Sequence, residues 1–221
     1  MSSDLPACIL AAADAVDAAR DELGRLDAVA GDGDHGLTMA LGARAVRRAI
    51  EANPGVPAAD LLAKVALAMG SIGGAIGPIY ATALLKTAGA VRASDTWDGA
   101  VTVARLRVCA EAAVAAVAAL GHAKPGDKTI LDSMIPLADS FRASEADGAS
   151  LETALVRARD AARAGAERTS AMIASIGRAA RLGEQSRGTA DAGATSFALI
   201  VAAAVDAHLA GARDPFPGGA T

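Results

Sequence analysis

The sequence predicts an all-α protein, because its apolar residues are mostly small, its aromatic residues are few and its patterning is helical. Hydrophobic residues make up 52% of the 221 residues and aromatic residues only 2%, so the apolar content is largely Ala, Leu, Val and Ile. Alanine is the best helix former, whereas β-sheets favour β-branched and aromatic side chains. A chain of this length can bury a full core as one domain. We expect a single domain over residues 1–221, built as an eight-helix up-and-down barrel or bundle.

Helical periodicity and breaker residues give the eight expected helices in order. They cover residues 5–23, 37–52, 57–69, 78–91, 94–120, 130–144, 150–176 and 194–209. The run from Asn53 to Gly55 ends the second helix, and Pro57 suits the first turn of the third. Ser94 or Asp95 can cap the fifth helix. The tail, from about residue 212 to 221, contains several Gly and Pro residues and is expected to be flexible.

Four of the connections between these helices are rich in glycine or in polar residues. They follow the first, third, fifth and seventh helices and cover residues 24–36, 70–78, 121–129 and 177–193. Alternate loops of an up-and-down bundle lie at the same end. The remaining connections have the composition of plain turns. The topology therefore predicts one functional rim that gathers all four loops.

Charge and composition argue against several other classes of protein. The net charge of −4 does not suit a nucleic-acid-binding surface, which needs a basic face. The N-terminus lacks a secretory signal, and Cys8 and Cys109 are expected to be free thiols, as is usual in the cytoplasm. The longest uncharged stretch, residues 65–85, has four glycines and Pro78 at its centre. These would break a lipid-exposed helix, so we expect a cytoplasmic protein without a membrane span.

The first polar loop has the composition of a magnesium site. Asp27, Asp32 and Asp34 lie within eight residues, beside His35, on a loop that three glycines allow to fold tightly. Carboxylates with no soft ligand nearby select Mg²⁺ or Ca²⁺ over zinc, and the spacing does not fit an EF-hand. Magnesium bound in this way keeps positions open for phosphates. The structural alternative is that the aspartates only form Asp-Gly turns and helix caps.

The other three loops offer groups that can bind phosphate. Glycines at 70–74 can expose backbone N–H groups to an anion, although small residues at a close helix crossing would give the same pattern. The segment Gly121–Thr129 differs from a Walker A motif by one inserted Asp, and it follows a helix. We interpret Lys128 as part of a polar helix start more readily than as a phosphate ligand. The last loop carries Arg178, Arg181 and Arg187, and arginine suits bidentate phosphate contact, although several of the charges in this loop are expected to be solvated surface groups.

Taken together, five segments resemble the L subunit of dihydroxyacetone kinase, which is equivalent to the C-terminal nucleotide-binding domain of single-chain dihydroxyacetone kinases. The matching segments are Ala30–Gly36, Gly73–Pro78, Lys124–Thr129, Leu182–Glu184 and Asp191–Ser196. They occur in the order found in the family and span nearly the whole chain. The pairing of Gly-Asp-Gly-Asp-His-Gly with Lys-Pro-Gly-Asp-Lys-Thr is specific to this family.

The resemblance implies an eight-helix barrel that binds ADP or ATP at one rim. It implies that Asp27, Asp32 and Asp34 ligate magnesium, expected to be two ions, and that this chain has no catalytic residue beyond these ligands. It places the following residues around the nucleotide: His35, Gly36, Leu37, Thr38, Gly70, Ser71, Gly121, Ile130, Arg178, Asp191, Ala192 and Gly193.

The resemblance also implies partners and a reaction. A K subunit would hold dihydroxyacetone or a related ketose covalently, and magnesium-dependent phosphoryl transfer would reach that sugar. In one mode ADP stays bound as a cofactor and is rephosphorylated by a phosphohistidine-carrying M subunit of the sugar phosphotransferase system. Two alternatives are an L subunit that exchanges ATP from solution, and one that mainly binds and regulates a transcription factor.

Five positions depart from the usual family pattern. Ile72 and Ile76 replace small or hydroxyl residues in the phosphate loop, so a hydroxyl–phosphate contact is expected to be missing. Arg181 replaces a typical Tyr, Gln185 a typical Arg and Ala192 a typical Pro. These substitutions leave the metal aspartates intact but affect the details of the nucleotide lid.

Overall fold

The computed structural model describes residues 4–93 and 100–213, which form nine α-helices and two short 3₁₀ helices and contain no strand. The α-helices are α1 (Asp4–Ala18), α2 (Arg20–Ala30), α3 (His35–Glu51), α4 (Ala58–Gly70), α5 (Ile76–Ala93), α6 (Val103–Gly121), α7 (Leu131–Ala146), α8 (Leu151–Arg168) and α9 (Ala192–Arg213). The 3₁₀ helices are η1 (Thr169–Ala171) and η2 (Ala179–Ser186). The predicted all-α class is confirmed.

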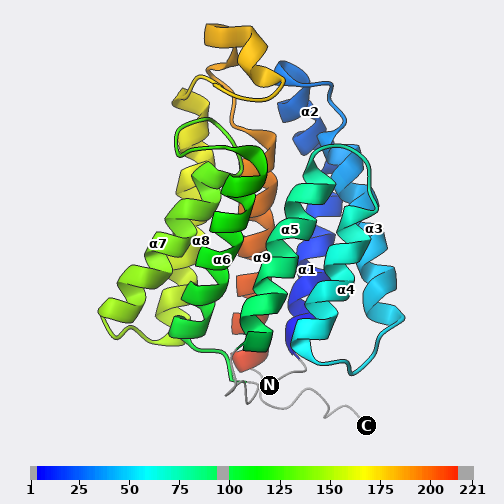
Figure 1. Ribbon diagram of the computed structural model, residues 1–221, viewed down its shortest axis with the longest axis vertical. Helices are drawn as coiled ribbons and strands as arrows, with labels where there is room; N and C mark the ends of the chain where they lie inside the picture. The colour runs from blue at the N-terminus through cyan, green and yellow to red at the C-terminus, as the bar shows by residue number, and fades with distance from the viewer. Residues whose placement is uncertain (1–3, 94–99, 214–221) are drawn as a thin grey trace.

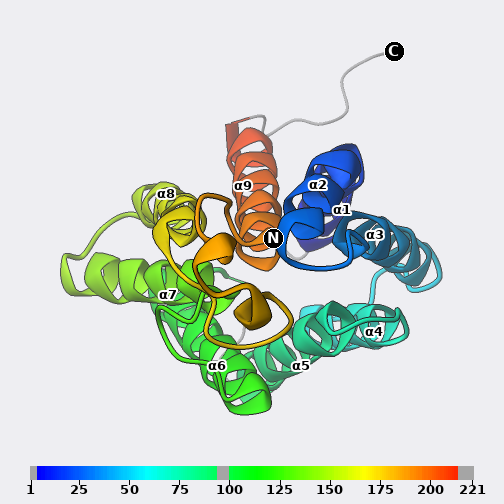
Figure 2. The ribbon, with the colours of Figure 1, turned by 90° about the horizontal axis from the view of Figure 1, so that it is seen from above.

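The helices form a closed ring in which each packs beside its neighbours in sequence. The contacts run from α1 to α3, through α4, α5, α6, α7 and α8 to α9, and α9 returns to α1. Figure 2 shows this ring from above, with α2 and η2 lying over one end. Counting α1 and α2 as one bent rod, the ring has the eight up-and-down helices expected from the sequence.

Small residues let neighbouring helices approach to backbone contact. Gly165 of α8 faces α7 so closely that a Cβ atom there would lie 2.3 Å from the carbonyl oxygen of Asp132. Beside it, the Ser133 hydroxyl donates a 2.8 Å hydrogen bond to the carbonyl oxygen of Ala162. The scarcity of aromatic residues is explained by such crossings, because larger side chains would force the helices apart.

The predicted end of the first helix at Leu23 and the predicted loop at residues 24–36 are wrong. The helix bends at Ala19 and continues as α2 to Ala30, so only residues 31–34 form the loop. Gly24 does not break the helix. Close approach depends on Gly36, because a Cβ atom there would lie 1.9 Å from the carbonyl oxygen of Arg20 and 2.7 Å from the backbone nitrogen of Gly24. The missing side chain of Gly36 therefore lets the start of α3 pack directly on α2.

The predicted end of the seventh helix and the predicted start of the fifth also differ from the structure. The predicted seventh helix, residues 150–176, is too long, since α8 ends at Arg168 and the chain passes through η1 into an extended segment. The proposed caps Ser94 and Asp95 lie outside the described residues. Within them, α6 begins after Thr102, whose side chain accepts a hydrogen bond from the backbone N–H of Arg105. The predicted fifth helix starts too early, since the described residues 100–102 are not helical. The predicted eighth helix, 194–209, ends too early, because α9 continues to Arg213. The predicted second, third, fourth and sixth helices agree with the structure to within about two residues.

The four polar connections all lie at the end of the ring where α2 and η2 are found, at the top of Figure 1. The plain turns at residues 52–57 and 147–150 lie at the other end, as loop parity predicts.

Residues 65–85 form the end of α4, a loop and the start of α5, as expected. By length and composition, residues 192–212 of α9 would be apolar enough to cross a membrane, but core helices pass the same test, and α9 is one wall of the ring. Of the predicted tail from about residue 212, residues 212 and 213 still belong to α9, and 214–221 lie outside the described residues.

Candidate functional site

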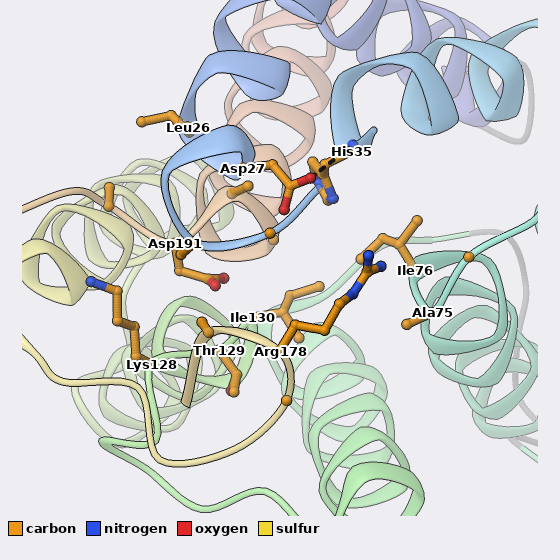
Figure 3. Close-up of a pocket in the computed structure, with 18 of the residues that line it drawn as sticks. Leu26, Asp27, His35, Ala75, Ile76, Lys128, Thr129, Ile130, Arg178 and Asp191 are labelled. Atoms are coloured by element: carbon orange, nitrogen blue, oxygen red, sulfur yellow. Dashed lines mark hydrogen bonds between the residues drawn. The ribbon is translucent and has the colours of Figure 1, made fainter. Parts of the chain in front are cut away.

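A cleft of about 300 Å³ opens at the polar end of the ring. Its walls come from the end of α2, the starts of α3, α5 and α9, the loop before α7, and the segment that contains η2. Figure 3 shows acidic and basic side chains from these separate elements directed into one space, with Asp27, Asp191 and Arg178 on different sides. Residues far apart in the sequence thus share a single concave site, which is the usual form of a small-molecule site.

Asp27, Asp32 and Asp34 form the acidic side of the cleft. Each offers a carboxylate oxygen, and these oxygens lie within 4.8 Å of one another. Asp27 is in the last turn of α2, whose continuation was not expected, and its Oδ2 also accepts a 3.3 Å hydrogen bond from the backbone N–H of His35. Three oxygen donors at this spacing fit a hard divalent cation such as Mg²⁺.

The charges of these carboxylates are unequal. Arg178 donates a hydrogen bond to Asp32, which lowers the pKa of that carboxyl below its ordinary value. The pKa of Asp34 is raised, first by desolvation and then by the negative charges of Asp32 and Asp27. Part of the negative charge is therefore left uncompensated beside Asp34, where a cation would be stabilised.

A hydrogen-bonded chain of three side chains crosses the inside of the ring beneath the aspartates. His35 Nε2 lies 3.1 Å from Ser196 Oγ, and the Tyr80 hydroxyl lies 3.3 Å from the same Ser196 oxygen. Tyr80 is buried, and this burial raises the pKa of its hydroxyl. Burial also lowers the pKa of His35, opposed by the charge of Asp27. These hydrogen bonds hold the His35 imidazole in place beside the acidic loop. Tyr80 was not among the predicted site residues, although it is the only tyrosine in a sequence rich in small residues.

Asp191 is a partly buried carboxylate at the start of α9. Its Oδ2 accepts a 2.7 Å hydrogen bond from the backbone N–H of Ala194, and its own N–H donates to Thr169 Oγ1 at 2.8 Å. Desolvation raises the pKa of Asp191 to about 6, against the helix N–H groups and the charge of Lys128, which lower it. Asp191 thus caps α9 and also lines the cleft as a carboxylate whose ionised form is disfavoured by desolvation.

Lys128 lies in the wall of the cleft, in the loop that precedes α7, and is not part of the helix itself. Its side chain is buried, with a residue exposure of 5%, and its backbone has a left-handed φ of 62°. The ammonium donates hydrogen bonds to the carbonyl oxygens of Met172, Ser186 and Thr189. The Lys128 ammonium is therefore hydrogen-bonded to the part of the chain that contains η2, residues 172–189. The sequence could not show this, because the acceptors are backbone atoms 44 to 61 residues away.

The glycine-rich loop reaches the cleft through its second half. Gly74, Ala75 and Ile76 line the cleft, whereas Ser71 turns back to donate a 2.7 Å hydrogen bond to the carbonyl oxygen of Ala68. Ile72 packs into the core, and its Cδ1 would lie 3.1 Å from a Cβ atom on Gly42. The Ile72 departure thus serves packing. Arg181 and Gln185 are exposed and do not line the cleft.

Most of the site residues expected from the sequence meet at this cleft. Its lining includes Asp27, Asp34, His35, Thr38, Ile130, Arg178, Asp191, Ala192 and Gly193. Asp32 joins them through Arg178. Those that do not line it are Gly36, Leu37, Gly70, Ser71 and Gly121. Gly36 packs on α2, Leu37 is 54% exposed, and Gly70, Ser71 and Gly121 are exposed at the ends of α4 and α6. Lining residues that the prediction missed include Thr129, Gly177, Ala179, Thr189 and Ala190.

Comparison with known proteins assigns this site to a family, since the model of the DAK2 domain matches residues 29–206. The chain belongs to the DAK2 domain family. Over 180 residues it is 34% identical to the ADP-binding subunit DhaL of the PEP-dependent dihydroxyacetone kinase of Escherichia coli K12, covering 80% of this chain and 82% of that subunit. Over 187 residues it is 42% identical to the L-erythrulose 1-kinase of Mycolicibacterium smegmatis, covering 82% of this chain and 31% of the kinase.

The fold agrees with that of a solved dihydroxyacetone kinase. The dihydroxyacetone kinase of C. freundii, in complex with AMP-PNP and Mg²⁺, superposes with a TM-score of 0.70 and 25% sequence identity, over 93% of this chain and 34% of that one. The chain spans about a third of the length of the first curated relatives that it matches, the erythrulose kinases, but most of the length of the DhaL subunits.

Proposed function

We propose that this chain is the nucleotide-binding L subunit, or the equivalent domain, of a kinase that phosphorylates dihydroxyacetone or a related small ketose. The observation that carries the proposal is the convergence of three carboxylates and Arg178 on one cleft. The relatives support it, since they include an ADP-binding subunit of a dihydroxyacetone kinase and a kinase of the four-carbon ketose erythrulose. The solved relative in complex with AMP-PNP and Mg²⁺ supports both a nucleotide and magnesium as ligands.

The residues of the acidic loop fit magnesium. Asp27, Asp32 and Asp34 present hard oxygen donors close enough to share metal ions, of which we propose two, and no sulfur or imidazole donor is part of the cluster. Bound magnesium would neutralise phosphate charge and hold the phosphates in line for transfer. The aspartates would bind and orient the metal. Arg178, when it is not paired with Asp32, would donate to phosphate oxygens.

The rest of the cleft suits the remainder of a nucleotide. Ile79, Ile130 and Ile176 supply apolar surface. Gly193 leaves its backbone open beside Asp191, where a Cβ atom would lie 3.1 Å from the Asp191 carboxylate. We propose no base for a sugar hydroxyl on this chain, since the aspartates of the acidic loop would hold magnesium, His35 lies against Ser196 and Asp191 caps α9. Catalysis on this chain would therefore be positioning and charge neutralisation.

We propose that the acceptor sugar is held by a partner of the K type, or by a further part of the same chain as in relatives about three times this length, of which this chain covers about a third. Dihydroxyacetone is named for the DhaL subunits, which match over most of their length. Erythrulose is a second candidate, because three erythrulose kinases are 38 to 42% identical, compared with 34% for the DhaL subunits.

Two phosphoryl sources fit the same site. In the first, ADP stays bound and is rephosphorylated by a phosphohistidine-carrying M subunit, which agrees with the PEP-dependent relatives. In the second, ATP exchanges from solution. Regulation of a transcription factor by the same surface is an additional role that the nucleotide site does not exclude. We propose the cytoplasm as the compartment, in keeping with the similarity to bacterial kinase subunits.

A reconstituted assay tests this function. The chain is combined with a K-type subunit, Mg²⁺, and either ATP or a phosphohistidine donor, and phosphorylation of dihydroxyacetone and of erythrulose is followed by ³¹P NMR. We expect phosphorylated ketose only when all components are present, and none with the Asp32→Asn/Asp34→Asn variant. Unchanged turnover by that variant, or no turnover with either donor and either sugar, would refute the proposal.

A further inference from the structure

Lys128 is the most unusual buried charge outside the acidic cluster. A lysine with a φ of 62° adopts a conformation that costs side-chain-bearing residues about 1 kcal/mol or more. Here that backbone conformation accompanies a side chain that is almost fully enclosed. A strained backbone that buries a charge is retained only when the buried group makes specific contacts.

Those contacts fasten both ends of one segment. Met172 begins the segment and Ser186 and Thr189 lie near its end, and all three carbonyl oxygens accept from the single Lys128 ammonium, the last at 2.7 Å. An ammonium has three N–H donors, so the contacts use its full capacity. In Figure 3 the Lys128 side chain points away from His35 and Arg178.

The neighbouring residue strengthens the same attachment. Asp127 accepts a 2.5 Å hydrogen bond from the Ser175 hydroxyl, and its carbonyl accepts from the Ser175 N–H at 3.3 Å. Residues 172–189, here called the η2 segment, are therefore held at several points by the Gly-Asp-Lys portion of the loop before α7. This segment carries Gly177, Arg178 and Ala179 to the edge of the cleft.

We propose that Lys128 is a positioning residue that holds the η2 segment over the cleft and so places Arg178 for phosphate contact, and that Lys128 itself binds no phosphate. Its role in nucleotide binding rests on the proposed function. Its role in fastening the segment does not, because all the contacts lie within the chain.

Limited proteolysis tests the fastening without any ligand. The η2 segment contains Arg178, Arg181 and Arg187 as trypsin sites. In Lys128→Met the three carbonyls lose their donor, and we expect cleavage in the segment to accelerate by about tenfold or more. The exposed Lys124→Met, in the same loop, is the matched control and should be cleaved at the wild-type rate. Equal cleavage rates for Lys128→Met and wild type would refute the proposal that Lys128 holds the η2 segment.

Coupling to Arg178 tests the positioning. We expect the Kd for Mg–ADP to rise about tenfold in Lys128→Met and in Arg178→Ala, with little further rise in the double variant. A direct phosphate ligand would instead give additive losses, and additive losses would overturn the proposal. If wild type binds no Mg–ADP, the proposed function fails while the proteolysis result still decides the fastening.

A conservative variant covers the case in which Lys128→Met does not fold. Lys128→Arg keeps the charge but presents a planar fork, which cannot direct three donors from one atom at the same carbonyls. We expect trypsin to cleave the η2 segment of Lys128→Arg at a rate between those of wild type and Lys128→Met, and Mg–ADP binding to be weakened in proportion. Wild-type cleavage together with weakened binding would identify Lys128 as a phosphate ligand and overturn the proposal.

Discussion

Replacing Asp191 by asparagine is expected to stabilise the protein at neutral pH and to flatten its stability between pH 4 and pH 7. Burial is the main cause that raises the pKa of Asp191 from 3.8 to about 6. The same carboxylate caps α9 by accepting from the Ala194 N–H at 2.7 Å. Asparagine caps a helix about as well as aspartate but carries no charge. The substitution therefore removes the unfavourable charge and keeps the cap.

The sign and the size follow from proton linkage. An acid whose pKa is raised by folding binds its proton more tightly in the folded state. The stability that Asp191 contributes is complete below pH 3.8 and is lost as the pH rises through about 6. A pKa difference of about 2, at 1.36 kcal/mol for each pH unit, corresponds to roughly 3 kcal/mol of unfolding free energy. Because Asp191 is only partly buried, we expect about 1 to 3 kcal/mol.

Urea denaturation in EDTA, without nucleotide, at pH 4, 5, 6 and 7 measures this effect. The free energy of unfolding of Asp191→Asn should equal that of wild type near pH 4 and exceed it by about 1 to 3 kcal/mol at pH 7. Asp206→Asn, at an exposed position on the same helix, is the control and should change stability by less than about 1 kcal/mol at every pH. Parallel pH profiles for wild type and Asp191→Asn would refute the reasoning.

Two further predictions concern the acidic loop. Gly36→Ala places a Cβ atom 1.9 Å from the carbonyl oxygen of Arg20, so it should destabilise the protein by roughly 3 kcal/mol, about 10 °C in Tm, whereas Gly73→Ala, which meets no atom within 4 Å, should change the Tm little. A Tm for Gly36→Ala equal to that of Gly73→Ala would contradict the close docking of α3 on α2. Arg178→Ala frees the Asp32 carboxylate, so in calorimetry it should bind Mg²⁺ alone up to about fivefold more tightly, yet bind Mg–ADP about tenfold more weakly. Changes in the same direction for both ligands would show that Arg178 does not exchange between Asp32 and phosphate.

The sequence was sufficient for the ring and for the gathering of the polar loops. Helical patterning and loop parity depend on local composition, and local composition also marked the acidic loop and Asp191 as polar residues at one end. Prediction from local composition failed where the role of a residue depends on contacts with backbone atoms far away in the sequence. The predicted loop began at Gly24, whereas α2 continues to Ala30, and the close contact of Gly36 with the α2 backbone exists only after α2 and α3 pack together.

Local composition also could not separate the two halves of the phosphate loop or place Lys128. The predicted cradle at residues 70–74 contains both Gly70, which lies outside the cleft lining, and Gly74, which lines the cleft, and only the backbone path distinguishes them. Lys128 was assigned by its neighbours in sequence, whereas its environment is set by carbonyls of the η2 segment and by a positive φ. Such tertiary contacts leave no periodic signal in the sequence.

The central claim, that the cleft binds a nucleotide through magnesium held by the aspartates, is tested most directly by titrating ADP into the protein by isothermal calorimetry, with Mg²⁺ and with EDTA. We predict one ADP bound per chain with Mg²⁺, binding lost in EDTA, and binding lost in Asp32→Asn/Asp34→Asn while that variant keeps the wild-type helical circular dichroism. Binding that is equally tight in EDTA, or unchanged in the folded double variant, would contradict the account.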